Sequence, residues 1–352
     1  MNCFDWIILT LIKKIDGQRT TGGIYHLLTG KRSAQTIQDA YLFDCYEITG
    51  SFKDLNRNSF EGVLTDLSKK GLLKAGHDEN TFYLTRAGER ELHILSNKYK
   101  LPDGYNGGKY DWSGAAALLW ERFSLLFQSL SFLAAGKKTF IPVTYRPETQ
   151  RWVKQQFHGL NTSVEAINEK LYYELVHFLE LLPEREASLF VSRLTSPGRT
   201  GKTYNQLTAD FNDDPQYARL YFQSVLHRLL EIAKDPSRYP LMFSIINDLN
   251  PHQILTWSAK ETNLFLKQGR TLEQIMESRG LKKSTIEDHV IELALYDPGF
   301  SYGQFICQSD AEAILQAADQ LETKRLKLIK DKLGSEYTYF QIRLALTQKE
   351  RT

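Results

Sequence analysis

One stretch of the sequence comes close to a nucleotide-binding motif, from Gly198 to Thr203. A phosphate-binding P-loop needs a glycine, four further residues and then Gly-Lys-Ser/Thr, so that backbone N–H groups surround the phosphates between a strand and a helix. Here Ser196 stands where the first glycine belongs, and the pattern before it is helical. We therefore expect a polar loop that opens a helix from Tyr204 to Ala209, and no nucleotide cofactor.

The other residue types that support catalysis or metal binding form no pattern. The eight histidines lie at unrelated spacings, and none has the His-x-x-x-His spacing of a helical metal site. The two aspartates before Pro215 are expected to begin a helix, where negative charge is favourable. We expect no catalytic residue, no metal, no cofactor and no small-molecule substrate, so the sequence predicts a protein that is not an enzyme.

Length and composition indicate a globular protein of two or three domains, at roughly 100–200 residues each. The 352 residues are 42% hydrophobic and 24% charged, with a mean hydropathy of −0.39. The formal charge of +2 gives no basic field over the whole molecule, so any contact with nucleic acid must come from a local patch.

Cysteine usage and the first apolar run bear on location. The three cysteines are an odd number and lie far apart, which argues against a disulfide framework and fits a reducing cytoplasm. The run from Trp6 to Ile12 follows Asp5 rather than a basic segment and is too short to span a bilayer. We expect it to form a core helix and not a signal peptide or a membrane span.

Two short helices joined by a tight turn are predicted from Thr271 to Leu295. Thr271 and Ser284 each have a Gln or Glu three positions later, which is the spacing of a capping box. Between them, Gly280 can adopt the left-handed conformation that ends a helix. The pattern predicts a helix-turn-helix.

The apolar residues of this stretch support the same interpretation. Leu272 and Ile275 are expected to face Ile286, Val290 and Leu293, so that both helices bury one side against a common core. Helix pairs of this spacing also occur in plain helical bundles, which stays open as an alternative.

If this stretch reads DNA, the start of its second helix supplies the contacts, as in other helix-turn-helix proteins. The residues expected to be exposed there and to touch DNA are Lys282, Lys283, Ser284, Thr285 and His289, although a solvent-facing His289 is the simpler interpretation. Glu287, Asp288 and Glu292 on the same helix would repel phosphates.

A second basic group lies near the C-terminus, in an amphipathic helix predicted from Ser309 to Lys332. It is made of Lys324, Arg325, Lys327, Lys330 and Lys332. Five cations on one helical stretch can hold phosphates in a salt-dependent way. The same pattern also fits the solvated face of an amphipathic helix.

Residues 1–100 have the order of a winged-helix domain: helices, an amphipathic helix from Arg57 to Lys70, two short extended segments and a closing helix. The turn of the ribbon, Gly76 to Asn80, holds His77, Asp78 and Glu79. A ribbon that lies along phosphates would be basic. DNA binding and protein interaction therefore both stay open for this domain.

The rest of the chain is predicted to be mainly α-helical. Residues 101–112 are rich in Pro, Gly, Asn and Asp and are expected to form a linker. A helical middle domain follows over residues 113–250, interrupted by a short extended piece from Thr139 to Tyr145, and a C-terminal helix-turn-helix domain covers residues 251–348.

Several of these segments resemble a known family. They are Gly23 to Asp39, Gly269 to Ile275, Arg279 to Leu281, Ser284 to His289, and Tyr339 to Arg343. The C-terminal part is similar to the helix-turn-helix domain at the C-terminus of some RecQ-type DNA helicases, and the whole chain looks like the YpbB-type proteins of Gram-positive bacteria. The resemblance implies a RecQ-type helicase as partner, and it carries over no catalytic residues.

Together these features predict a cytoplasmic accessory protein that binds a RecQ-type helicase, DNA or both in repair or recombination. The alternative is a transcription regulator that places two helix-turn-helix units on an operator. That alternative requires a dimer matched to half-site spacing.

Overall fold

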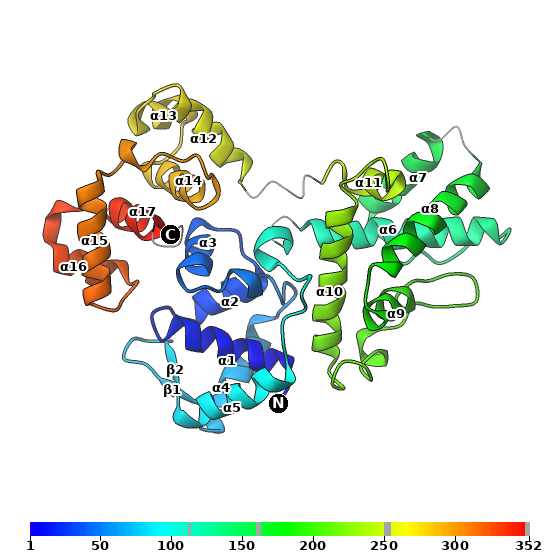
Figure 1. Cartoon of the computed structure of the whole chain (residues 1–352), viewed down its shortest axis with the longest axis horizontal. Helices are drawn as coiled ribbons and strands as arrows, with labels where there is room; N and C mark the ends of the chain where they lie inside the picture. Colours follow the sequence, from blue (N-terminus) through cyan, green and yellow to red (C-terminus); the bar gives the residue numbers. More distant parts are fainter. Residues whose placement is uncertain (112–113, 160–162, 250–254, 349–352) are drawn as a thin grey trace. The chain divides into compact units, whose positions relative to one another are not determined.

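The computed structural model describes residues 1–111, 114–159, 163–249 and 255–348. These residues are mainly helical, and their strands form one two-stranded antiparallel ribbon (Figure 1). The predicted fold class is therefore confirmed. No helix among the described residues combines the length and the apolar character needed to cross a membrane.

The chain divides into two compact units. One contains Met1–Ile7 with His93–His252, and the other contains Ile8–Leu92 with Gln253–Thr352. Most of the N-terminal region thus shares one unit with the C-terminal region, and we call this unit the terminal unit. The other, which holds the middle of the chain together with Met1–Ile7, is called the middle unit. The predicted domain boundaries at residues 100, 112 and 250 stay predictions, and residues 112 and 250 lie outside the described part.

The N-terminal part of the terminal unit has winged-helix order. Its elements are α1 (Cys3–Ile15), α2 (Thr21–Thr29), α3 (Ala34–Leu42), α4 (Arg57–Lys69), β1 (Leu73–Ala75), β2 (Phe82–Leu84) and α5 (Arg86–Lys98). α1 and α5 each extend from this unit into the middle unit. In the ribbon, Leu73 pairs with Leu84 and Ala75 with Phe82. Gly71 follows α4 with a φ of 71°, a left-handed conformation that glycine adopts without strain.

The C-terminal part of the terminal unit is helical throughout its described residues. Its helices are α12 (Trp257–Lys267), α13 (Leu272–Arg279), α14 (Lys283–Tyr296), α15 (Gln308–Gln320), α16 (Leu326–Leu333) and α17 (Tyr339–Gln348). The single helix predicted from Ser309 to Lys332 is wrong, because the chain leaves the helix at Leu321 and Glu322 takes a φ of 46°.

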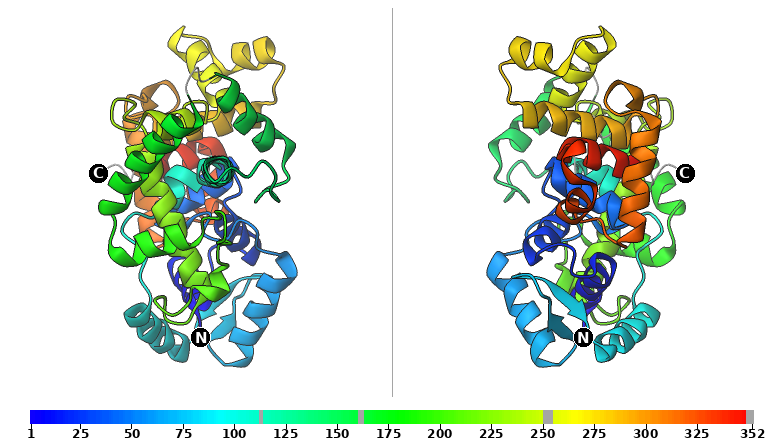
Figure 2. Two further views of the ribbon diagram at one scale, coloured as in Figure 1. Left: turned by 90° about the vertical axis from the view of Figure 1, so that its right-hand side faces the viewer. Right: turned by 90° about the vertical axis from the view of Figure 1, so that its left-hand side faces the viewer.

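α14 lies at the centre of the terminal unit. It packs against α12 and α13 on one side and against α3 and α17 on the other (Figures 1 and 2). Residues from both ends of the sequence therefore share one core.

The middle unit is a helical assembly around aromatic side chains. Its helices are α6 (Ala115–Ala134), α7 (Pro147–Gly159), α8 (Val164–Glu180), α9 (Glu184–Ser192), α10 (Pro215–Ile232) and α11 (Pro240–Ile246). Phe123, Phe178 and Phe222 are almost fully buried around Phe190. The segment before α6 is held in place, since the N–H of Asn106 donates to Nδ1 of His227 at 3.0 Å.

Three details of the middle unit differ from expectation. α7 and α11 were not predicted. The predicted helix from Tyr204 to Ala209 is only a 3₁₀ turn, Tyr204–Gln206. The piece from Thr139 to Tyr145 forms no strand, and its backbone is bound instead by the side-chain amide of Gln128, which joins Ile141 and Val143 at 2.9 Å each.

Candidate nucleic-acid interface

The turn between α13 and α14 has the predicted geometry at its first helix. The Thr271 hydroxyl accepts from the N–H of Gln274 at 3.3 Å, and the Gln274 side chain accepts from the N–H of Thr271 at 3.0 Å. Gly280 ends α13 with a φ of 62°. The second predicted capping box is wrong, because α14 begins at Lys283, after an N-cap at Lys282 without a side-chain cap.

The apolar contacts of the two helices are confirmed. Ile275, Ile286, Val290 and Leu293 are fully buried, while Leu272 is half-buried. Because α14 is covered by α12, α3 and α17, most of its length is closed to any ligand. Its exposed part is the first turn.

That first turn carries four of the five predicted DNA contacts. Lys282, Lys283 and Ser284 are exposed, and Thr285 is half-buried. The N-terminus of a helix carries a partial positive charge, which adds to the two lysines in attracting phosphate. A helix-turn-helix also uses the N-terminal residues of its second helix to contact bases.

A groove of about 610 Å³ runs beside this turn. Lys283 lines it together with Arg270 and Thr271 at the start of α13 and with Thr338 and Gln341 at the start of α17. Cationic and polar side chains thus continue from the first turn of α14 onto the neighbouring starts of α13 and α17. Two carboxylates, those of Glu273 and Glu287, also line the groove.

The exposure expected for His289 is wrong. Its side chain is 8% exposed, and Nδ1 lies 2.8 Å from the hydroxyl of Thr262 on α12. Burial, and secondly the positive charge of Arg279, lower the pKa of His289 below its usual 6.5. A neutral, buried imidazole cannot contact DNA unless the domain opens. His289 is therefore a core residue and not a DNA contact.

Arg279, at the end of α13, is the centre of this partly buried network. Its guanidinium donates to the carbonyl of Ser258 at 2.7 Å and to the carboxylate of Glu261 at 2.6 Å, and it also reaches the hydroxyl of Thr262. Sequence reasoning missed this role, although Arg279 and His289 both lie in segments that carry the family resemblance.

The carboxylates that argued against DNA binding are largely engaged within the protein. Asp288 accepts from Arg343 of α17 at 2.7 Å. Glu292 is buried and accepts from the hydroxyl of Thr256 at 2.9 Å. Glu287, the third of them, lines the groove together with Lys283. The repulsion expected from this helix is therefore smaller than its sequence suggests.

The five cations near the C-terminus do not form one stripe. The side chain of Arg325 is bound to Asp78 of the ribbon turn and to the carbonyl of Gly17. Lys324 lies over the ring of Phe43 at 5.3 Å, and Lys330 donates to the carbonyl of Tyr337. Lys327 and Lys332 alone among the five are exposed, both on α16.

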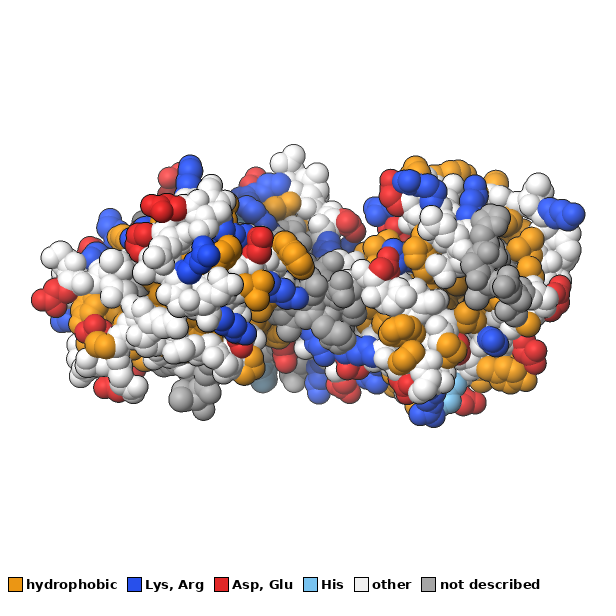
Figure 3. Space-filling view, turned by 90° about the horizontal axis from the view of Figure 1, so that it is seen from above, with side chains coloured by type: hydrophobic (Ala, Val, Ile, Leu, Met, Phe, Trp, Pro, Cys, Tyr) orange, Lys and Arg blue, Asp and Glu red, His pale blue; other side chains and the backbone are white. Residues whose placement is uncertain are grey.

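Surface charge agrees with the small net charge. On the face seen in Figure 3, Lys and Arg side chains are interspersed with Asp and Glu side chains. A local contact such as the first turn of α14 is thus better suited to phosphate than that face as a whole.

Comparison with known proteins gives the family. A family model described as a helix-turn-helix domain matches residues 258–346, from α12 into α17. Over 349 aligned residues the chain is 33% identical to Protein YpbB of Bacillus subtilis (strain 168). The alignment covers 99% of this chain and 98% of that protein. The chain belongs to the YpbB family. No solved structure matches the chain. In this YpbB-family protein, the helix-turn-helix match covers the partly buried Arg279 network and the exposed first turn of α14.

Proposed function

We propose that this YpbB-family protein is a cytoplasmic, non-enzymatic DNA-binding protein that contacts duplex DNA with the first turn of α14. The observation that carries the proposal is the exposure of Lys282, Lys283 and Ser284 at the start of the second helix of a matched helix-turn-helix domain. This is where that fold places residues that contact DNA.

The structure also guides which cations enter the proposal. Lys324, Arg325 and Lys330 are left out because their side chains contact other parts of the chain. Lys327 and Lys332 are exposed, but they lie on an eight-residue helix outside the helix-turn-helix pair. Phosphate contacts position a protein on DNA, and Ser284 and Thr285 can add contacts to base edges.

We propose further that the protein acts as an accessory to a RecQ-type DNA helicase in repair or recombination. The support for this step is the family resemblance of the terminal segments. It can be tested separately, by asking whether the purified full-length chain and a purified RecQ-type helicase from the same organism elute together in gel filtration.

The DNA-binding proposal is tested by fluorescence anisotropy with the full-length protein and two labelled DNAs, a plain duplex and a forked duplex. We expect binding to both, falling steeply as salt rises, because cations released from phosphates drive the association. A preference for the fork would support the helicase-accessory role. Absence of binding to either DNA at low salt would contradict the proposal.

A further inference from the structure

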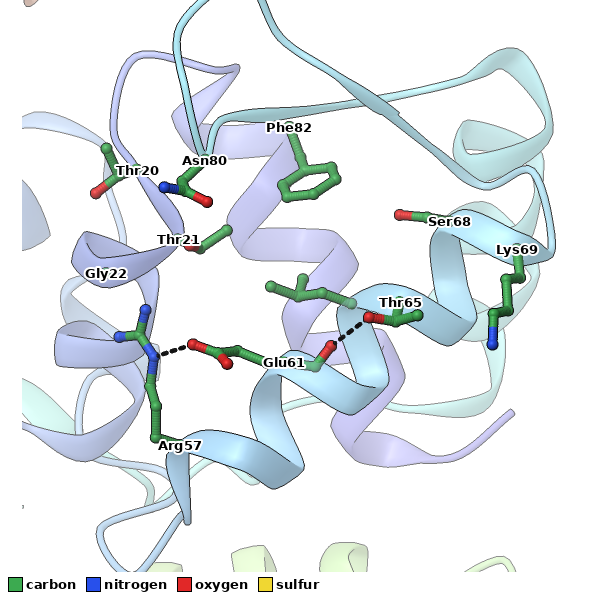
Figure 4. A pocket seen from close by; sticks show the side chains of 11 residues that line it. Thr20, Thr21, Gly22, Arg57, Glu61, Thr65, Ser68, Lys69, Asn80 and Phe82 are labelled. Carbon is green, nitrogen blue, oxygen red and sulfur yellow. Dashed lines mark hydrogen bonds and ion pairs between the residues drawn. The ribbon is translucent and has the colours of Figure 1, made fainter.

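The terminal unit has a second polar pocket, far along the sequence from the helix-turn-helix. It has a volume of about 700 Å³ and lies between the N-terminus of α2, the exposed side of α4 and the ribbon (Figure 4). Its walls include Thr20, the N-cap of α2, and Thr21 and Gly22 of α2. They also include Arg57, Ser68 and Lys69 of α4.

One hydroxyl group of this pocket is buried without a hydrogen-bond partner in the described part of the chain. It is the hydroxyl of Ser68, which points into the pocket in Figure 4. Thr21 is only 6% exposed, and its backbone N–H donates to the carbonyl of Asn80 at 2.8 Å. Buried polar groups are normally hydrogen-bonded, so the unpartnered hydroxyl of Ser68 indicates a polar ligand in this pocket.

The charges around the pocket favour an anion. Arg57 and Lys69 are cations that line it, and α2 points its N-terminus at it. The guanidinium of Arg57 is held in place over the ring of Tyr25 at 5.0 Å, and it pairs with Glu61 at 2.7 Å. Glu61 is the one carboxylate among the described lining residues, so the side chains that line the pocket keep a net positive charge.

Gly22 is the point of backbone access in the first turn of α2, because the N–H groups of Thr21 and Gly23 donate to the carbonyls of Asn80 and Thr20, at 2.8 and 2.9 Å. A methyl group added to Gly22 would meet the Thr20 hydroxyl at 3.4 Å and the guanidinium of Arg57 at 4.0 Å. The absence of a side chain at Gly22 thus leaves room for a ligand atom between the first turn of α2 and Arg57. Glycine at the start of a phosphate-binding helix has the same effect, because it lets an anion approach the backbone N–H groups.

We propose that this pocket binds a phosphate group, and that the phosphate is a phosphodiester of a bound DNA strand. Hydroxyl, guanidinium and ammonium donors together suit phosphate oxygens, and the phosphate competes with Glu61 for Arg57. The assignment of this phosphate to DNA rests on the proposed function. It means that the N-terminal part of the chain contacts the same DNA as the first turn of α14. The phosphate chemistry of the pocket stands on its own residues.

The test uses two glycine variants of the full-length protein. Gly22→Ala puts a methyl group into the pocket, whereas Gly23→Ala adds the same methyl group one residue later, against the side chain of Arg19 at 3.4 Å. Both changes favour helix, so both variants should fold, and circular dichroism checks this. We expect Gly22→Ala to weaken duplex binding about tenfold and Gly23→Ala to leave it unchanged.

Removing the negative charge of Glu61 should have the opposite effect on duplex binding. Glu61→Gln releases Arg57 and should strengthen duplex binding several-fold, by more than Asp66→Asn, which removes an exposed carboxylate from the same helix outside the pocket. Equal effects of Glu61→Gln and Asp66→Asn would show that only the overall charge of α4 matters and would overturn the pocket.

Inorganic phosphate, titrated by calorimetry into the same variants, separates the two sources of the ligand. If Gly22→Ala weakens both phosphate and duplex binding, the DNA assignment stands. If it weakens phosphate binding alone, or if the wild type binds phosphate but no DNA, the pocket takes a free phosphate group and the DNA assignment fails. If Gly22→Ala and Gly23→Ala behave alike toward both probes, the proposal is overturned.

Discussion

Arg279 and His289 hold the helix-turn-helix together from the inside. Arg279 joins the end of α13 to Ser258 and Glu261 of α12, and His289 of α14 meets the same helix at Thr262. Because three helices converge on these two side chains, the first turn of α14 is positioned by polar contacts as well as by apolar packing. A partly buried, hydrogen-bonded network of this kind fixes one arrangement of the helices.

The lowered pKa of His289 predicts a pH dependence of stability. In the folded protein the neutral imidazole is favoured, so the unfolded chain takes up the proton first as pH falls through 6.5. The neutral His289 therefore contributes its full stabilisation of the folded state above pH 6.5. This contribution is lost as pH falls from 6.5 to the lower pKa of His289 in the folded state. Urea unfolding at about pH 7.5 and about pH 5.5 measures this, with a loss of up to ~1.4 kcal/mol per pH unit.

The variant His289→Gln should lose less unfolding free energy than the wild type over the same pH range, because it cannot take up the proton. His93→Gln, a change at an exposed histidine, is the matched control and should behave like the wild type. A wild-type slope that persists in His289→Gln would contradict the account of this residue.

Single helices were largely predictable, and their ends were predictable where the signal is local. The caps at Thr271 and Gly280 are examples, since each depends on residues within one turn. The break between α15 and α16 was not predictable, because the segment contains no Gly or Pro. It forms where the N–H of Lys324 and the hydroxyl of Thr323 bind the side chain of Gln18, at 2.7 and 3.3 Å. A contact with a distant segment thus overrides helix propensity.

α11 shows the same limit, because its cap comes from another helix. The carboxylate of Glu174 on α8 accepts from the N–H groups of Leu241 and Met242, at 2.9 Å each. Burial raises the pKa of Glu174, against the opposing effect of these two hydrogen bonds. No sequence pattern links a glutamate to a helix start that lies 67 residues later.

Glu174→Ala should therefore destabilise the protein by ~2 kcal/mol, because the first N–H groups of α11 lose their buried acceptor. Glu180→Ala, at an exposed position of the same helix, should change stability by less than ~0.5 kcal/mol. Urea unfolding of both variants at neutral pH measures the difference. Equal stabilities would show that Glu174 does not cap α11.

At the scale of the molecule, the main unpredicted feature is the union of the N-terminal and C-terminal regions. The side-chain amide of Gln38 on α3 donates to the carbonyl of Arg343 on α17 at 2.9 Å and accepts from its guanidinium at 3.0 Å. These residues lie 305 positions apart, and both belong to segments that carry the family resemblance. Periodicity predicts which face of a helix is buried, but it does not show which distant segment covers that face.

The candidate nucleic-acid interface was also predictable only where its signal is local. The first turn of α14 follows from the helix-turn-helix pattern. The burial of His289 depends on its contact with α12, and the pairing of Arg325 with Asp78 depends on the position of the ribbon, so neither could be predicted. The pocket beside Gly22 joins two helices and a ribbon, so no single stretch of sequence marked it.

The contact between Gln38 and Arg343 predicts a coupling energy. In a double-mutant cycle of Gln38→Ala and Arg343→Ala, the two changes should be non-additive by ~1 kcal/mol, because either one alone breaks the hydrogen bond from the Arg343 guanidinium to the Gln38 side chain. The bond from Gln38 to the backbone carbonyl of Arg343 is lost only in Gln38→Ala and does not enter the coupling. A control cycle pairs Gln38→Ala with Lys267→Ala, an exposed position on α12, and should be additive. Additivity in the first cycle would contradict a shared terminal unit.

DNA should contact the first turn of α14 and not α16. The measurement is the salt dependence of duplex binding by two double variants of the full-length protein, Lys282→Ala with Lys283→Ala and Lys327→Ala with Lys332→Ala. The first pair should weaken binding and lower the slope of log K against log salt by up to about 1.8, at about 0.9 per phosphate contact, while the second leaves both unchanged. Unchanged affinity and slope in the first pair, or a loss confined to the second, would contradict the proposed contact.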